Sequence, residues 1–308
     1  MKIRIGFAPG QIPIGPAGQP LLRDLVEMAD DVGFDSIWLS DRIIGDRFPL
    51  EPIVAMSLVA GYSDSLKFGT SVLALPMRNP VLLAKELATL DYLSNGRLLP
   101  AIGIGQEDPA DYEASGITKD GRGRRSDESI EIIRRLWAED TVTHEGAFYS
   151  FRDVSILPKP IQKPGPPIWI GGRSKAAQRR TGRVGDGWLV SQATPEEIER
   201  GIKVIFETAS EHDRVVDEDH IGSMLGFCIA PTTEKASTVA SPYLIRQRPE
   251  VSMNDYCGLG TPQHVADMIT KYSNAGATKF VVRPMCPSNL AFEQLQLFGR
   301  EVLPLFHD

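Results

Sequence analysis

Two apolar segments with a helical segment between them constrain the fold of this chain more than any other feature. A strand-like run begins at Phe68, a helical run spans Pro80–Leu93, and a second strand-like run spans Arg97–Gly105. Two strands that are joined by one crossover helix form a βαβ unit, in which the strands are parallel. Parallel sheets are covered by helices, so an α/β architecture is expected.

The same alternation extends along the rest of the chain. Eight strand-like segments begin at positions 2, 36, 67, 98, 168, 187, 222 and 279. Eight strands interleaved with helices over about 300 residues predict a single (β/α)8 TIM barrel that spans residues 1–308. An open doubly wound sheet fits less well, because the glycine-rich fingerprint of that fold is absent after Phe7.

Helices are expected between these strands, and two segments do not fit the alternation. Thr194-Pro195 and Thr261-Pro262 each supply an N-cap followed by proline at the first helical position. The segments Gln106–Arg125 and Thr141–Pro167 are predicted to be insertions outside the barrel, the second with a hairpin around Glu145-Gly146. The other expected helices are Leu21–Val32, Ile53–Ala60, Ser126–Leu136, Ser174–Val184 and Leu290–Val302.

Composition argues against several classes of protein, including those that bind nucleic acids and those that span a membrane. The net charge of −7 argues against a nucleic acid partner, since a phosphate backbone requires a basic face. No apolar run is long enough to cross a membrane, and the first residues lack the apolar core of a signal peptide. The three cysteines have no CxxC spacing, which favours free thiols and a cytoplasmic location.

The geometry of a barrel predicts where its functional residues lie. Catalytic and binding side chains of barrel enzymes lie just past the C-terminal ends of the strands. No histidine stands at a predicted strand end and there is no G-x-S-x-G motif, so no metal is expected and serine hydrolase chemistry lacks support. The candidates at strand ends are Asp41, Arg42, Gly105, Gln106, Glu107, Gly171, Gly172, Arg173, Ser174 and Arg283.

The turn from Gly171 to Ser174 carries the strongest physical signal. A strand ends there, two glycines permit close approach of a ligand, and a helix begins near Ser174. Free N–H groups at a helix N-terminus bind phosphate, and Arg173 adds positive charge. The turn therefore predicts a phosphate site held by backbone amides, and the alternative is a tight turn without a ligand.

The other candidates each have a second interpretation. Asp41 and Arg42 form either a simple ion pair or a catalytic pair beside a ligand. Glu107 is a candidate acid or base, or a solvated surface carboxylate. Arg283 either binds an anionic substrate or forms a surface salt bridge.

The chain resembles the luciferase-like family of flavin- and deazaflavin-dependent oxidoreductases. The tracts Asn79–Asp91 and Gly96-Arg97-Leu98 are similar to the best-preserved segment of that family, and Trp169–Lys175 resembles its cofactor-phosphate site. The resemblance implies an enzyme with a small-molecule substrate that forms a homo-oligomer, namely a dimer. It further implies that cofactor contacts come from Asp41, Ser71, Val72, Gly103, Gly105, Gln106, Gly171, Gly172, Arg173 and Ser174.

The resemblance favours the deazaflavin F420 as cofactor, with hydride transfer as the reaction, and FMN-dependent monooxygenation as the alternative. Many deazaflavin members carry His where Arg42 stands, and Arg cannot serve as an ordinary general base. This departure leaves open a non-catalytic flavin-binding protein. Substrate specificity is expected from Pro9–Gln19, Gln106–Arg125 and Pro231–Gly260.

One further expectation also rests on the resemblance. Related proteins have a non-proline cis peptide in the third strand, and the matching bond here joins Ser71 and Val72. Local propensity by itself favours an ordinary trans strand at Val72.

Overall fold

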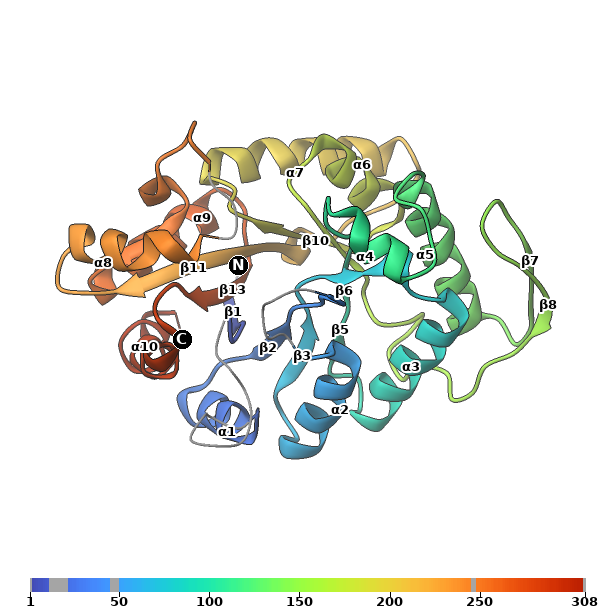
Figure 1. The fold of residues 1–308 in the computed structure, drawn as a ribbon, viewed down its shortest axis with the longest axis horizontal. Coiled ribbons are helices and arrows are strands. Elements are labelled where there is room, and N and C mark those ends of the chain that lie inside the picture. Colours follow the sequence, from blue (N-terminus) through green and yellow to red (C-terminus); the bar gives the residue numbers. More distant parts are fainter. Residues whose placement is uncertain (1, 11–21, 45–49, 245–247, 307–308) are drawn as a thin grey trace.

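A closed parallel barrel is the centre of the fold (Figure 1). The structure is a computed structural model that describes residues 2–10, 22–44, 50–244 and 248–306. The barrel strands are β1 (Arg4–Phe7), β2 (Ser36–Leu39), β3 (Lys67–Thr70) with β4 (Leu73–Ala74), β5 (Leu98–Leu99) with β6 (Ala101–Gly103), β9 (Trp169–Gly171), β10 (Gly187–Ser191), β11 (Ile221–Ile229) and β13 (Lys279–Pro284).

The strand pairing confirms the predicted (β/α)8 barrel. β3 and β4 are two halves of the third barrel strand, and β5 and β6 are two halves of the fourth. With these halves joined, every strand pairs in parallel with two neighbours, and β1 against β13 closes the circuit. The outer helices are α1 (Leu22–Val32), α2 (Pro52–Tyr62), α3 (Pro80–Leu93), α5 (Arg122–Ala138), α6 (Lys175–Val184), α7 (Pro195–Ser210), α9 (Pro262–Asn274) and α10 (Ser288–Glu301).

Several boundaries differ from the predictions. α5 begins at Arg122, before the expected Ser126, because its arginine-rich first turn has no apolar periodicity to reveal it. The segment 231–260 contains α8 (Thr233–Ala240) and the strand β12 (Cys257–Gly260), both missed by the sequence analysis. β12 pairs with the end of β11, and its sequence Cys-Gly-Leu-Gly gives no strand pattern because two of its four residues are glycine.

The predicted insertions do lie outside the barrel circuit. The first contains α4 (Pro109–Ala114), and the second contains the expected hairpin as β7 (Val142–Glu145) and β8 (Ser150–Val154). The buried carboxylate of Asp91 on α3 anchors the second insertion, since it accepts hydrogen bonds from the N–H groups of Ile161 and Gln162 at 2.8 and 3.0 Å.

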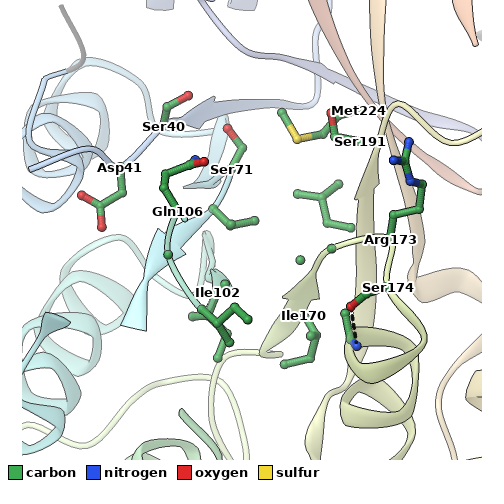
Figure 2. Close-up of a pocket in the computed structure, with 18 of the residues that line it drawn as sticks. Ser40, Asp41, Ser71, Ile102, Gln106, Ile170, Arg173, Ser174, Ser191 and Met224 are labelled. Atoms are coloured by element: carbon green, nitrogen blue, oxygen red, sulfur yellow. Dashed lines mark hydrogen bonds between the residues drawn. The ribbon is translucent and has the colours of Figure 1, made fainter. Parts of the chain in front are cut away.

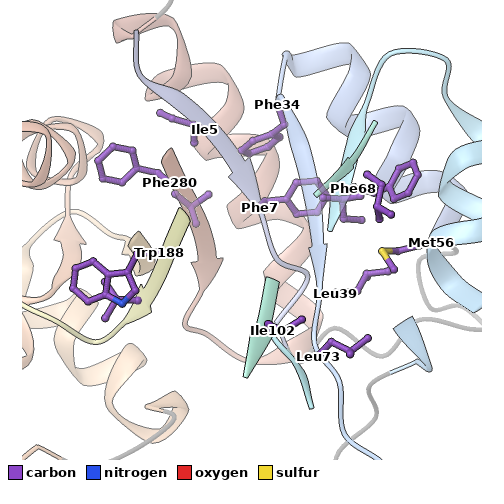
Figure 3. Close-up of a cluster of buried hydrophobic side chains, with 14 of the residues drawn as sticks. Ile5, Phe7, Phe34, Leu39, Met56, Phe68, Leu73, Ile102, Trp188 and Phe280 are labelled. Carbon is purple, nitrogen blue, oxygen red and sulfur yellow. The ribbon is translucent and has the colours of Figure 1, made fainter. Parts of the chain in front are cut away.

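Apolar side chains fill the space between the barrel and its helices (Figure 3). Phe7 on β1 packs on Phe34, whose ring stacks at 5.9 Å from Phe298 on α10. The barrel interior is filled by two tryptophans, Trp38 and Trp169, which meet edge to face at 6.3 Å. Alternate residues of a strand face opposite sides, so Trp38 points inward while its neighbours on β2 pack outward.

A buried ion pair lies at the N-terminal end of the barrel. The ammonium group of Lys279, 2% exposed, donates to the Asp35 carboxylate and to Ser36 Oγ. Ser36 Oγ also accepts a hydrogen bond from Trp38 Nε1 at 2.8 Å. Burial lowers the pKa of Lys279 to about 8, and the charge of Asp35 only partly offsets that effect.

Candidate functional site

A cavity of about 970 Å³ opens at the C-terminal end of the barrel strands. Barrel geometry brings strand ends that are far apart in sequence to this one rim. Figure 2 shows Asp41, Ser71 and Gln106 on one side of the cavity and Arg173 and Ser174 on the opposite side. All the residues predicted from the sequence line it: Asp41, Arg42, Ser71, Val72, Gly103, Gly105, Gln106, Glu107, Gly171, Gly172, Arg173, Ser174 and Arg283.

The floor of the cavity is apolar. The Val72 side chain occupies the space above two glycines: a methyl group at Gly103 would lie 2.6 Å from Val72 Cγ2, and one at Gly171 would lie 2.7 Å from Val72 Cγ1. The peptide bond between Ser71 and Val72 is cis, as the resemblance predicted. Gly171 is thus required to leave room for Val72. The other apolar side chains of the floor are Ile102, Ile170, Leu189 and Met224.

Asp41 does not pair with Arg42. Its carboxylate, 2% exposed, accepts hydrogen bonds from the backbone N–H of Ala74 and from the guanidinium of Arg78, each at 2.9 Å. Arg78 also binds Glu51 at 2.9 Å. Asp41 therefore connects the end of β2 to β4 and to the turn after it, behind the cavity wall that Ser71 and Val72 form.

Arg42 lies on the same rim with a different partner. Its Nε donates to the Ile44 carbonyl at 2.8 Å, and the guanidinium is exposed. The simple Asp41–Arg42 ion pair considered from the sequence is wrong, because Arg78 takes the place of Arg42. Arg42 is left to face the cavity as a permanent cation.

Glu107 stands exposed at the mouth of the cavity. It pairs with Lys119 at 2.7 Å and with Arg122. Hydrogen bonds from Lys119 and Arg122 lower the pKa of Glu107 to about 2. Such a carboxyl group stays ionised at ordinary pH and cannot supply a proton as a general acid.

The loop after the fourth barrel strand is fastened by Tyr112 on α4. The buried hydroxyl of Tyr112 donates to the carbonyls of Ile104 and Gln106 at 2.9 and 2.7 Å. Gly105, at φ +82°, leaves room for that hydroxyl, which would lie 2.6 Å from an added Cβ. Sequence analysis missed Tyr112, whose position on a short helix gives no periodic signal.

The predicted phosphate turn precedes α6 as expected, with one correction. Ser174 is the N-cap, and its Oγ accepts from the Ala177 N–H at 3.2 Å. The Gly172 N–H donates to the Leu189 carbonyl at 3.4 Å, so it belongs to the strand ladder. The first N–H groups of a helix have no acceptor within that helix, and of the first residues of α6, Ala176 lines the cavity.

Two buried hydroxyl groups of the cavity wall have no hydrogen-bond partner among the residues that the structure describes. Ser71 Oγ lies beside the apolar floor, and Ser126 Oγ lies on α5, across from α6. A buried polar group without a partner is destabilising, and most such groups in proteins are satisfied. These two hydroxyls are therefore suited to bind a polar ligand. Ser126 was not predicted as a site residue, because the sequence marks it only as the start of a helix.

Arg283 and the loop after β10 complete the rim. Arg283 is buried at the cavity wall, where it donates to the Tyr243 carbonyl at 2.9 Å, so it is not a surface residue. The Gln192 carbonyl accepts hydrogen bonds from Arg173 at 2.7 Å and from Arg248 at 2.6 Å. Arg248 is further held by two 2.8 Å hydrogen bonds to Glu197. Residues 248–256 are thereby fixed against the rim.

Of the three segments expected to set specificity, two contribute described residues to the rim. Gly10 is the described part of Pro9–Gln19 that lines the cavity, and positions 11–19 lie outside the described residues. Within the described ranges, no three His, Cys, Asp or Glu side chains are grouped so as to hold a metal ion. No helix of the described chain is long and apolar enough to span a membrane.

Known proteins are similar to this chain in both sequence and fold. The family model described as luciferase-like monooxygenase matches residues 7–252. An F420-dependent glucose-6-phosphate dehydrogenase from Kineococcus radiotolerans is 28% identical, over 97% of this chain and 94% of that protein. An FMNH(2)-dependent dimethylsulfone monooxygenase from Pseudomonas fluorescens is 27% identical, over 93% of this chain and 86% of that protein.

Among solved structures, the monooxygenase RslO1 from Streptomyces bottropensis superposes with a TM-score of 0.84. It is 24% identical, and the match covers 99% of this chain and 100% of that one. At this level of identity the likeness supports the barrel fold. The relatives named above differ in cofactor, one using F420 and the other FMNH(2).

Proposed function

Because the chain belongs to the luciferase-like monooxygenase family, and is thus an oxidoreductase that uses a flavin-type cofactor, we propose that it is an F420-dependent enzyme that transfers hydride to or from a small organic substrate. The observation that carries this proposal is the cavity that the family's motifs form together, with an apolar floor and two unpartnered hydroxyls in its wall. When bound, the deazaflavin would supply the hydride chemistry, which no side chain can supply.

The residues of the cavity fit such a group in three zones. The floor around Val72 and Met224 suits a flat tricyclic ring, and Ser71 Oγ offers a hydrogen bond at its edge. Ser126 and the first turn of α6, with Arg173, suit a phosphate group. Arg42 and Arg283 lie on the rim as cations and favour a substrate that carries negative charge.

The neighbouring carboxylates do not provide a general acid. Asp41 is committed to Ala74 and Arg78, and Glu107 is held ionised by Lys119 and Arg122. In this proposal Asp41 positions the wall behind Ser71, and Glu107 orders the loop at the mouth. Any proton that accompanies hydride transfer comes from the substrate, from water or from a group on the described rim other than these two.

Cofactor titration tests the proposal. Purified protein is titrated with F420 and separately with FMN, and absorbance and fluorescence report binding. Tighter binding of F420, together with protein-dependent turnover of the reduced cofactor, is expected. Preferential binding of FMN and consumption of oxygen would favour the monooxygenase alternative. Binding without turnover of any tested alcohol, aldehyde or sugar phosphate would favour a non-catalytic flavin-binding protein.

The Ser126 hydroxyl gives a direct test of the phosphate zone. We expect Ser126→Ala to weaken cofactor binding by about tenfold, because a hydrogen bond to a charged group is lost. The thermal stability of the free protein should not fall, because Ser126 Oγ has no partner to lose in the described part of the chain. Ser129→Ala is the matched control, since Ser129 is also buried and unpartnered on α5 but does not line the cavity. Equal affinity of both variants would refute the assignment.

The homodimer implied by the family is proposed to form through α2 and α3. α2 is apolar on all sides, and a surface helix of a monomer normally has a polar outer face. Apolar side chains stay exposed on both helices, at Val54, Leu58, Leu82 and Leu93. Large exposed apolar surfaces of this kind mark interaction sites.

We expect Leu58→Glu to convert a dimer to a monomer in light scattering at micromolar concentration, since a charge would be buried without a partner. The free fold should persist, because Leu58 is half exposed. Val215→Glu, on a side chain that is 91% exposed elsewhere, is the control and should leave the mass unchanged. A monomeric native protein would contradict the proposal.

A further inference from the structure

A buried arginine lies behind the rim of the cavity without lining it. Arg248 belongs to the segment between β11 and β12, and its side chain is buried. Its Nε donates to Glu250 at 2.9 Å, and its two terminal nitrogens donate to the two carboxylate oxygens of Glu197, each at 2.8 Å. The guanidinium also lies over the ring of Tyr256, 5.6 Å from the ring centre. Because the donors of a guanidinium are planar and fixed, this bidentate contact holds Arg248 in one direction.

The carboxylate that holds Arg248 is itself fixed in place. Glu197 forms a capping box with Thr194 at the start of α7. Its carboxylate accepts a hydrogen bond from the Thr194 N–H at 2.9 Å, and Thr194 Oγ1 accepts one from the Glu197 N–H at 3.3 Å. A capping box satisfies two N–H groups that the helix leaves without an acceptor. Arg248 is therefore anchored to the first turn of α7, beside the loop that follows β10.

One donor of Arg248 reaches the rim of the cavity. Its Nη1 donates to the Gln192 carbonyl at 2.6 Å, and Gln192 lines the cavity just after β10. Gln192 has a φ of +53°, in the left-handed region that residues other than glycine rarely adopt. Such a conformation persists where the surrounding structure holds it. The hydrogen bond from Arg248 therefore helps to fix a turn that local preference would not fix.

The same carbonyl holds the predicted phosphate turn, Gly171–Ser174. Arg173 is exposed and lines the cavity, and its Nη1 donates to the Gln192 carbonyl at 2.7 Å. The Arg173 carbonyl accepts a hydrogen bond from Gln178 on α6 at 3.2 Å. A long side chain loses conformational freedom when it is fixed, so an arginine that is already held binds an anion at a lower entropic cost. The phosphate turn is thus connected to α7 through the Gln192 carbonyl and Arg248.

Arg248 also occupies a carboxylate that would otherwise attract Arg173. Although burial acts to raise the pKa of Glu197, hydrogen bonds from Arg248 and the charges of Arg248 and Arg173 lower it. Glu197 therefore stays ionised at ordinary pH and keeps its hold on Arg248. In a protein without Arg248, the Glu197 carboxylate would be open to Arg173, and that ion pair would compete with an anion bound in the cavity.

We propose that Arg248 is a positioning residue for the cofactor phosphate, because it holds the carbonyl that Arg173 binds and occupies the carboxylate that would compete for Arg173. Arg248 does not line the cavity, so it acts through Gln192 and Arg173 and not by contact with the cofactor. The inference rests on the proposed function, which places the phosphate at the turn before α6.

The experiment compares ligands with and without a phosphate. The native protein, Arg248→Met and Arg248→Lys are titrated with F420 and with the same deazaflavin truncated before its phosphate, and separately with FMN and riboflavin. Fluorescence reports the affinities. We expect Arg248→Met to weaken binding of the phosphate-bearing form about tenfold, the size of one hydrogen bond to a charged group, and to leave the phosphate-free form within about twofold. Arg248→Lys keeps a cation beside Glu197 and should show a smaller loss of the same kind, which also serves if the methionine variant folds poorly.

A second set of variants separates positioning from general stability. Arg173→Met should weaken binding of the phosphate-bearing form by itself, and the addition of Arg248→Met should weaken it little further, because both side chains act through one carbonyl. Arg97→Met is the control for stability. Arg97 donates to the carbonyls of Leu66 and Ala60, each at 2.9 Å, at the N-terminal end of the barrel, and its loss should leave the native ratio of affinities unchanged.

Three results would overturn the inference. These are equal losses for the phosphate-bearing and phosphate-free ligands in Arg248→Met, additive losses in Arg173→Met/Arg248→Met, and equal affinity of the native protein for both forms. Tighter binding of FMN than of F420 would instead contradict the proposed function, and the ratio of FMN to riboflavin affinity would then decide the role of Arg248.

Discussion

Replacement of Asp41 by alanine is expected to lower the free energy of unfolding by about 3 kcal/mol and to abolish tight cofactor binding. The variant would leave the mostly buried Arg78 guanidinium and the Ala74 N–H without their shared acceptor. The cost lies at the lower end of the usual range because Arg78 keeps its second partner, Glu51. The side-chain link from Asp41 to β4 and to Arg78 would then be lost, while the backbone pairing of β2 with β3 remains.

Chemical denaturation and cofactor titration measure the two effects separately. Asp41→Asn retains an acceptor for Ala74 and should lose less stability than Asp41→Ala. Arg42→Ala is the control at the neighbouring position: it breaks no contact with Asp41 and should keep native stability. If Asp41→Ala retained full stability and cofactor affinity, the described role of the carboxylate in the cavity wall would be wrong.

A comparable loss of stability is expected at the opposite end of the barrel. Lys279→Met would leave the Asp35 carboxylate, which is 26% exposed, without its cation, and should cost about 3 kcal/mol, the lower end of the range for a buried pair. The double variant Lys279→Met/Asp35→Asn should recover part of that loss, because no unpaired charge remains. Lys271→Met, which removes an exposed lysine, is the control and should change stability by less than about 0.5 kcal/mol.

The same lysine predicts a pH dependence with a defined sign. In the folded protein Lys279 has a pKa of about 8, whereas an unfolded lysine titrates near 10.4. Between those values the unfolded chain binds more protons, so the contribution of Lys279 to the free energy of unfolding rises with pH. Denaturation curves at pH 7.5 and 9.5 should show this rise in the native protein and a smaller one in Lys279→Met. An identical pH response in both proteins would contradict the shifted pKa.

The sequence alone predicts the barrel and most of the residues on its rim. Strand and helix periodicities are local, and eight alternating segments leave few arrangements other than a closed parallel barrel. Since working residues of a barrel lie at strand ends, that topology also selected Asp41, Gln106, Arg173 and Arg283, which the structure brings to one cavity. The cis bond at Ser71 was predictable from the family resemblance and not from propensity.

Tertiary structure decided which partner each charged group has. The sequence places Arg42 next to Asp41, yet Asp41 binds Arg78 from the turn after β4, because adjacent residues at the end of a strand point to different sides. The same holds for Lys279, which meets Asp35 only because β13 and β2 flank β1 in the closed barrel. Periodicity reports which face of an element is buried. Pairing between distant elements depends on barrel closure, which brings side chains from separate strands within hydrogen-bonding distance.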